Sequence, residues 1–248
     1  MIFRLWSFLA YFLGIFIGKN QRIGQLAPPN RTSHTREMKT CLVTGASRGL
    51  GSALAESLST EMHIIAVART VGALEELDDR IKGRSGNATL APMDVTDAGA
   101  MAHLSRSLFN RWGGLDLWIH TAIHAPPLSP VPTVDQKDWT KTYKTNVEAT
   151  LMMITNIAPV LSATPDAKAV FFDDPHRGEK FFGAYAASKA AQIALIQSWQ
   201  NETSKTGPIV KIVTPDPMAT ATRARFYPGE DRSRLTSPKD EAQRLLPQ

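Results

Sequence analysis

Short apolar runs alternate along the chain with longer stretches in which apolar residues recur at helical spacing. The runs have the length of buried β-strands and cover residues 39–43, 63–68, 87–93, 115–122, 168–172 and 209–213. The stretches between them are typical of amphipathic helices and cover residues 50–58, 71–82, 97–112, 131–162 and 183–204. This alternation predicts an α/β fold: a Rossmann-type, doubly wound parallel sheet with helices on both faces.

Composition limits the choice of function without selecting one. The 248 residues, 43% of them hydrophobic, are enough for a single domain with a full core. The net charge of +5 permits anion binding, but the one basic cluster (Arg223, Arg225, Arg232 and Arg234) is interpreted as a solvated face, so no nucleic acid is expected. A single cysteine excludes an internal disulfide, and no Cys/His group has zinc spacing, so no metal is expected.

The first 37 residues differ from the rest of the chain. Residues 5–18 carry no charge, but a membrane span needs roughly 20 apolar residues. We favour either a weak membrane anchor or an over-extended start, with the native chain beginning at Met38. A signal peptide is less well supported because no A-x-A cleavage site follows. We therefore expect an N-terminal segment 1–37 and a cytoplasmic domain 38–248, with membrane association through residues 5–18 as an alternative.

A glycine-rich loop connects the first predicted strand to the first predicted helix. Gly45, Gly49 and Gly51 allow a tight turn and let a ligand approach the backbone closely. The helix that follows presents unpaired N–H groups and its positive dipole end, which suits a pyrophosphate. The spacing G-x-x-x-G-x-G is a variant of the dinucleotide fingerprint, and its position between strand and helix predicts a nucleotide site.

Arg69 directly follows the second predicted strand. At this position of a dinucleotide-binding sheet, an acidic residue reads the free ribose 2′-hydroxyl, whereas an arginine accommodates a 2′-phosphate. Arg69, helped by Arg48 in the glycine loop, therefore predicts NADP(H) as the cofactor.

Tyr185 and Lys189 lie four residues apart in an alanine-rich run that predicts a helix. The phenol and the ammonium would share one helix face, and the ammonium would lower the pKa of the phenol and ready it for proton transfer. The spacing alone is equally that of two polar residues on a solvated face. However, the glycine loop, Arg69 and Asp94 all fall at the carboxyl ends of predicted strands, where such sheets bind ligands.

Together these motifs resemble the classical short-chain dehydrogenase/reductase family over about residues 39–231. The C-terminal half is most similar to a YciK-like bacterial branch of it. The resemblance implies an enzyme that moves a hydride between NADP(H) and a small-molecule carbonyl or alcohol, and it leaves a homodimer open. The matching residues are Thr44-Gly-Ala-Ser-Arg-Gly-Leu-Gly51, Asp94-Val95, Asn146, Tyr185-x-x-x-Lys189 and Thr220.

The family pattern also implies a role for each matching residue. Tyr185 would be the acid/base, Lys189 would bind the nicotinamide ribose and lower the pKa of Tyr185, and Asn146 would hold a water that relays protons through Lys189. The residues implied to contact the cofactor are Thr44, Gly45, Ser47, Arg48, Gly49, Leu50, Gly51, Arg69, Asp94, Val95, Lys189 and Thr220.

The chain departs from the family pattern where a catalytic serine is expected, at the end of the fifth strand. Asp173 or Asp174 takes that place, and an ionised carboxylate cannot donate a hydrogen bond to a carbonyl. Its charge would also raise the pKa of a nearby tyrosine, and one missing donor costs on the order of 10²–10³ in rate. The family's final strand also has no counterpart, which predicts a C-terminally shortened domain.

Two functions therefore stay open. The first is an NADP(H)-dependent oxidoreductase with Tyr185, Lys189, Asn146 and Asp174 at its catalytic centre. The second is an NADP(H)-binding sensor or scaffold whose turnover is impaired. A membrane-tethered enzyme for a lipophilic substrate rests on residues 5–18 alone, and the polar stretch 222–234 is interpreted as a solvated flap.

Overall fold

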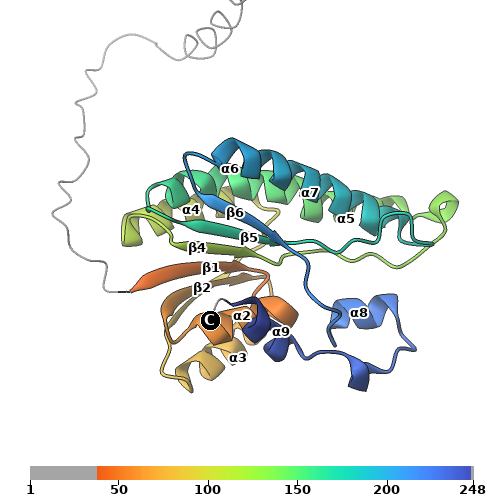
Figure 1. The fold of residues 1–248 in the computed structure, drawn as a ribbon, viewed down its shortest axis with the longest axis horizontal. Coiled ribbons are helices and arrows are strands. Elements are labelled where there is room, and N and C mark those ends of the chain that lie inside the picture. Colours follow the sequence, from red (N-terminus) through yellow and green to blue (C-terminus); the bar gives the residue numbers. More distant parts are fainter. Residues whose placement is uncertain (1–37, 247–248) are drawn as a thin grey trace, which may run out of the picture. The chain divides into compact units, whose positions relative to one another are not determined.

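The computed structural model describes residues 38–246 (Figure 1). The predicted apolar segment 5–18 and the polar stretch that follows it lie outside the described residues. Within the described range, no helix is both long enough and apolar enough to cross a membrane.

Six parallel strands form one sheet in the order β3-β2-β1-β4-β5-β6. The strands are β1 (Lys39–Thr44), β2 (Met62–Ala68), β3 (Ala88–Pro92), β4 (Leu117–His120), β5 (Lys168–Phe172) and β6 (Ile209–Val213). The predicted doubly wound Rossmann-type sheet is confirmed. Strand β4 is shorter than the predicted 115–122, because the Leu115 N–H bonds to the Val160 carbonyl (3.2 Å) before the chain reaches the sheet.

Helices cover both faces of the sheet (Figure 1). One face carries α2 (Gly49–Leu58), α3 (Val71–Lys82) and α9 (Pro238–Leu245). The other carries α4 (Ala98–Trp112), α5 (Gln136–Tyr143), α6 (Ala149–Ser162) and α7 (Gly183–Thr203). Each face has its own apolar core: Ile64 and Leu74 are buried in the first, and Trp118, Phe171 and Met153 in the second.

The predicted helical stretch 131–162 consists of several pieces. A 3₁₀ turn (Val131–Thr133) is followed by α5, whose first turn is capped by the Asp135 carboxylate accepting from the Lys137 and Asp138 N–H groups. A π-helical turn (Lys144–Glu148) then joins α5 to α6. Such π-turns are rare and frequently mark functional sites, and this one contains Asn146.

The strand order reverses at β1, which lies between β2 and β4. The chain segments leaving β1 and β4 therefore meet, and the Thr121 N–H donates to the Thr44 carbonyl (2.8 Å). Gly45 has a φ of +90°, and a Cβ there would lie 2.6 Å from the Ala122 nitrogen. This crossing of two loops requires glycine, and it lies at the sheet edge where ligands bind doubly wound folds.

Candidate active site

A single cleft of about 730 Å³ runs along the carboxyl edge of the sheet, from the glycine loop to α7. This volume lies in the range of small-molecule and cofactor sites. The cleft brings together most of the residues predicted for the site. They are Gly45, Ser47, Arg48, Gly49, Leu50, Gly51, Arg69, Asp94, Val95, Asp174, Tyr185, Lys189 and Thr220.

The glycine loop presents an open helix N-terminus to the cleft. Within residues 38–246, no side chain caps α2 at Arg48, and its first turn holds no acidic residue. Unpaired N–H groups and the positive dipole end therefore face the cleft, an arrangement that fits a pyrophosphate. A Cβ placed on Gly49 would lie 3.5 Å from the Thr220 methyl carbon, so the loop and the segment after β6 approach each other here.

Arg69 lies at the rim of the same cleft, at the end of β2. Its guanidinium is 3.8 Å from the Asp94 carboxylate, and the two side chains are 66% and 41% exposed. A long, exposed ion pair of this kind is worth little. The guanidinium can therefore turn toward an anionic group in the cleft at small cost.

Two predicted residues are buried instead of lining the cleft. Thr44 is fully buried, and its hydroxyl contacts His120 Nδ1 (2.8 Å) and Trp118 Nε1 (3.2 Å), so its side chain cannot reach a cofactor. Asn146 is also fully buried. Its carboxamide bonds to both backbone groups of His124 and to the Ser188 hydroxyl. The water-holding role of Asn146 stays a prediction.

The Tyr185 hydroxyl donates a hydrogen bond to Asp174 Oδ2 at 2.7 Å. Tyr185 is 3% exposed, and burial, followed by the charge of Asp174, raises its pKa well above the ordinary value. The expectation that Lys189 lowers this pKa is therefore wrong for the structure as it stands. Burial and two nearby carboxylates, Asp174 and Asp173, all raise this pKa.

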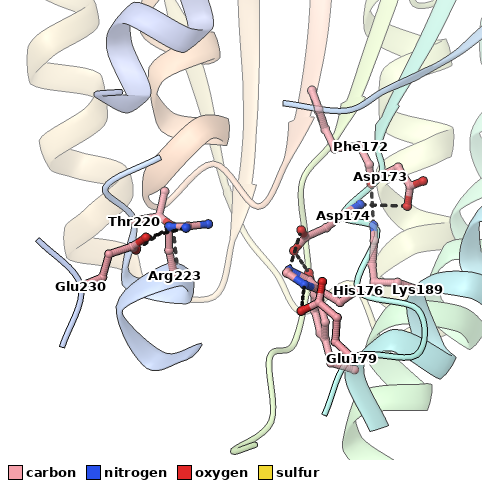
Figure 2. A network of polar contacts seen from close by, with 10 residues as sticks. Phe172, Asp173, Asp174, His176, Glu179, Lys189, Thr220, Arg223 and Glu230 are labelled. Carbon is pink, nitrogen blue, oxygen red and sulfur yellow. Dashed lines mark hydrogen bonds and ion pairs between the residues drawn. The ribbon is translucent and has the colours of Figure 1, made fainter. Parts of the chain in front are cut away.

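Lys189 lies below the end of β5 with its ammonium enclosed by protein (Figure 2). Its Nζ donates to the Phe172 carbonyl (2.5 Å) and to Gln192 Oε1 (2.7 Å). Burial lowers the pKa of Lys189 to about 8, against the opposing charges of Asp173 and Asp174. The pKa of Lys189 is therefore closer to neutrality than that of an ordinary lysine. Its ammonium is held by two acceptors of the protein itself.

A chain of buried polar side chains continues from Lys189 into the core. Gln192 Nε2 donates to the Thr150 hydroxyl (2.8 Å), which in turn donates to the Asn146 carbonyl (2.8 Å) and lies 3.3 Å from His120 Nε2. Burial, with a smaller effect of Lys189, lowers the pKa of His120 to about 3, so this ring is neutral. Gln192 could have been found from the sequence, because it lies three residues after Lys189 on the same predicted helix face. No pattern in the sequence links Thr150 to Lys189.

His176 is a further cleft residue that sequence analysis did not place in the site. Its Nε2 lies 3.0 Å from Asp174 Oδ1 and its Nδ1 lies 2.9 Å from Glu179 Oε2 (Figure 2). The ring stacks on Phe182 with a centroid distance of 4.2 Å. The only sequence signal is the charged connection between the fifth strand and Tyr185, which does not reveal these contacts.

The stretch predicted as a solvated flap forms part of the cleft wall. Helix α8 (Ala221–Phe226) buries Phe226, which is 6% exposed and lies 4.8 Å from the Tyr185 ring between centroids. Arg223 forms two hydrogen bonds of 2.6 Å with the Glu230 carboxylate and lies over the Tyr227 ring. The flap interpretation is wrong for this part of the stretch, because its aromatic residues pack against α7.

A model of the short chain dehydrogenase family matches residues 39–231, which include the sheet and all of the cleft residues except Pro238. Among curated proteins, sorbitol dehydrogenase of Cereibacter sphaeroides is 30% identical over 163 residues. That match covers 64% of this chain and 62% of the relative, so the chain spans less than two thirds of that protein's length.

Solved structures with the same fold include members of the bacterial branch expected from the sequence. The oxidoreductase yciK of E. coli has a TM-score of 0.74 and 25% identity, with 82% of this chain and 85% of that chain covered. A short chain dehydrogenase of Shigella flexneri, solved with NADP, also has a TM-score of 0.74 and 25% identity, with coverages of 82% and 87%.

Proposed function

Because the chain belongs to the short-chain dehydrogenase family, we propose that it is an NADP(H)-dependent oxidoreductase acting on a small-molecule carbonyl or alcohol. The observation that carries this proposal is the continuous cleft between the open N-terminus of α2 and the Tyr185–Lys189 pair. When bound, the nicotinamide would give a hydride to the carbonyl carbon or take one from the alcohol carbon.

The binding half of the cleft suits a phosphorylated dinucleotide. The N–H groups at the start of α2 would hold the diphosphate, and Asp94 and Val95 would border the adenine. Arg69 and Arg48 would hold the 2′-phosphate, since both line this end of the cleft and Arg69 is held only by a weak ion pair. The Shigella flexneri relative, solved with NADP, supports this choice of cofactor.

The reacting half would depend on Tyr185 as the proton donor to the substrate oxygen. The phenol would turn its O–H from Asp174 to the substrate oxygen, since Tyr185 and Asp174 both line the cleft in which the substrate would lie. Lys189 would hold the nicotinamide ribose, provided that its ammonium gives up one of its protein partners. Phe226 and the Tyr185 ring would exclude water from one side of the reacting carbon.

A second candidate function is an NADP(H)-binding sensor or scaffold with impaired turnover. The hydrogen bond from Tyr185 to Asp174 favours it, because the phenol that should face the substrate is engaged by an acceptor. In this alternative the cofactor site is retained and the reacting half is closed. The two candidates share the first step, cofactor binding, and differ in the second.

Binding and turnover should be measured in that order on the purified full chain. NADPH and NADH are titrated by fluorescence, and NADPH oxidation is then followed with a panel of ketones, aldehydes and quinones. We expect tighter binding of NADPH than NADH, with the preference lost in Arg69→Ala, and turnover that disappears in Tyr185→Phe.

The variant Asp174→Ser separates the two candidates. We expect it to speed the hydride-transfer step, measured in a single turnover with bound NADPH, by about 10²–10³, the effect of restoring one donor to the developing oxyanion. NADPH binding with no turnover in either the parent or this variant would sink the oxidoreductase proposal and leave the sensor. A preference for NADH would remove the role given to Arg69.

A further inference from the structure

We propose that Glu179, His176 and Asp174 form a proton relay that returns a proton to Tyr185 after each reduction. The inference rests on the proposed oxidoreductase function and adds to it the route by which the acid is recharged. The Asp174 carboxylate lies between His176 and the Tyr185 hydroxyl. His176 is therefore a positioning residue that acts on Tyr185 through this carboxylate.

The four side chains form an unbroken series of short polar contacts. Tyr185 donates to Asp174 Oδ2 (2.7 Å), Asp174 Oδ1 lies 3.0 Å from His176 Nε2, and His176 Nδ1 lies 2.9 Å from Glu179 Oε2. The Asp174 side chain is 41% exposed, but it lines the cleft, where bound cofactor and substrate would cover it. The Glu179 side chain is 47% exposed and is not among the cleft residues, and that of His176 is 12% exposed. The series therefore leads from Glu179, outside the cleft, to the phenol of Tyr185, which is 3% exposed.

The two carboxylates offer the His176 ring one acceptor for each of its nitrogens. An ionised carboxylate only accepts hydrogen bonds, and a neutral imidazole has one N–H donor. Both ring contacts can be hydrogen bonds at once only if the ring is an imidazolium, with Asp174 and Glu179 ionised. Phe182 stacks on the ring at an interplanar angle of 15°, which fixes the plane in which both nitrogens lie.

Other charged groups around the ring leave this arrangement in place. From α7, Tyr185 is neutral and Lys189 is turned toward Phe172 and Gln192. From α8 and the segment after it, the Arg223 guanidinium is paired with Glu230 and the Tyr227 ring lies 6.4 Å away between centroids. Asp173 directs its carboxylate to the Asp174 N–H. The carboxylates in contact with the His176 ring are Asp174 and Glu179.

The relay moves one proton from His176 to Tyr185 in each reduction. In the reduction, the carbonyl carbon receives a hydride and its oxygen receives the Tyr185 proton, which leaves a phenolate. The imidazolium then gives its Nε2 proton to Asp174 Oδ1. The protonated carboxyl group turns about its Cβ–Cγ bond and gives this same proton to the phenolate oxygen. The products are a neutral phenol, an ionised Asp174 and a neutral imidazole, which takes up a proton from solvent on the Glu179 side. The raised pKa of Tyr185 favours this direction.

The buried contacts of Lys189 are the reason a second route is needed. The family resemblance implies a relay through Lys189 toward Asn146, but here the Gln192 carboxamide lies between them. The Gln192 carboxamide accepts a hydrogen bond from Lys189 and donates one to the Thr150 hydroxyl. That hydroxyl in turn donates to the Asn146 carbonyl. A carboxamide does not titrate, so it holds the ammonium without exchanging protons.

The test compares His176→Gln with the unmodified chain. Glutamine keeps an N–H donor for Asp174 but cannot transfer a proton, so a structural role would survive and a relay would not. We expect kcat for NADPH-dependent reduction to fall about 10²-fold, at the low end of what a positioned proton donor contributes. The alkaline fall in the parent's pH profile should be absent from the variant, and NADPH affinity should be unchanged.

Two controls accompany this variant. His103→Gln makes the same substitution on the exposed face of α4, away from the cleft, and should leave kcat and its pH profile as in the parent. His176→Ala leaves space beside Phe182, and free imidazole should restore part of its rate in proportion to concentration. A His176→Gln variant with the parent's kcat and pH profile overturns the relay and leaves the oxidoreductase function intact.

A measurement independent of turnover uses ¹⁵N-labelled protein, with the His176 signals assigned by their loss in His176→Gln. The relay requires that both ring nitrogens carry protons at the pH at which the protein turns over. One unprotonated ring nitrogen overturns the relay, whether or not a substrate is found. Two protonated nitrogens in a protein without turnover would support the arrangement while the oxidoreductase function itself fails.

Discussion

The contact between Asp174 and Tyr185 determines the chemistry of this site at the scale of single residues. A serine at this place would donate a hydrogen bond to a substrate oxygen. Asp174 instead accepts a hydrogen bond from the Tyr185 hydroxyl at 2.7 Å. The carboxylate therefore stabilises the neutral phenol and raises its pKa, adding to the effect of burial. A tyrosine held in this state is suited to giving a proton in a reduction more than to taking one in an oxidation.

Removal of the Asp174 charge should lower the pKa of Tyr185. Asp174→Asn keeps the size of the side chain, removes the charge that favours the neutral phenol, and replaces the carboxylate by an amide whose carbonyl oxygen is a weaker acceptor. The tyrosinate absorbance of Asp174→Asn, assigned by subtracting a variant that also carries Tyr185→Phe, should appear at lower pH than in the parent. Asp173→Asn is the matched control and should produce a smaller shift, because Asp173 acts on Tyr185 only through its charge. An unchanged titration in Asp174→Asn would mean that burial alone holds the phenol neutral.

At the scale of elements, the cofactor half of the cleft depends on how closely α2 approaches the loops after β1 and β4. A Cβ on Gly51 would lie 2.3 Å from Thr121 Oγ1 and 2.6 Å from the Gly45 carbonyl oxygen. These neighbours are fixed, because the Thr121 hydroxyl donates to the Thr44 carbonyl (3.0 Å). The glycine therefore sets the distance between the helix N-terminus and the sheet edge.

Gly51→Ala should displace the start of α2 and weaken NADPH binding at least tenfold, about 1.4 kcal/mol, since the diphosphate would lose its aligned N–H groups. Fluorescence titration measures this loss. Gly72→Ala is the matched control in the first turn of α3, where an added Cβ meets nothing within 4 Å among the described residues. It should leave NADPH binding unchanged and raise the free energy of unfolding by about 0.5–1 kcal/mol. Equal NADPH affinity in both variants would contradict the role given to Gly51.

At the scale of the whole molecule, the site is joined to the core by the polar chain that starts at Lys189. Through Gln192, Thr150, His120 and Thr44, it crosses from α7 to α6, β4 and β1 between two layers of apolar side chains. A buried ammonium in such a chain costs desolvation that its hydrogen bonds only partly offset. The placement of Lys189 for function is therefore coupled to the stability of the domain.

The coupling predicts a pH dependence of unfolding. The folded-state pKa of Lys189 is about 8, below its ordinary 10.5, so between these values the unfolded chain binds more protons and stability rises with pH. Tyr185, whose folded pKa is raised above 10, acts in the opposite direction only at higher pH. Between pH 8 and about 9.5, Lys189 should add about 1.5 kcal/mol to the free energy of unfolding.

Urea unfolding at the two pH values measures this contribution. The rise should be missing from Lys189→Met and retained in Lys205→Met, which changes an exposed lysine. Lys189→Met should also be the more stable of the two at pH 8, because an apolar side chain of similar length carries no desolvation cost. The same rise in both variants would show that Lys189 is not the group responsible.

The sequence by itself determined the order of the six strands and of the main helices between them, and with them the fold; α8 was not predicted. Each strand is a local apolar run and each helix a local period. The strand predicted at 39–43 and the helix predicted at 183–204, which the structure places at 39–44 and 183–203, could therefore be located without knowledge of their neighbours. Glycine spacing likewise identified the loop at Gly45–Gly51. Boundaries moved by one or two residues where long-range contacts decide them, as at Leu115.

Only the tertiary structure decided which side chains share the site. Thr44 and Asn146 belong to the matching motifs, yet their side chains are buried by packing around β4 and α6. His176 and Gln192 belong to no motif, yet they contact Asp174 and Lys189. The physical reason is that a hydrogen bond depends on distances of a few tenths of an ångström between elements, and no local pattern encodes those distances.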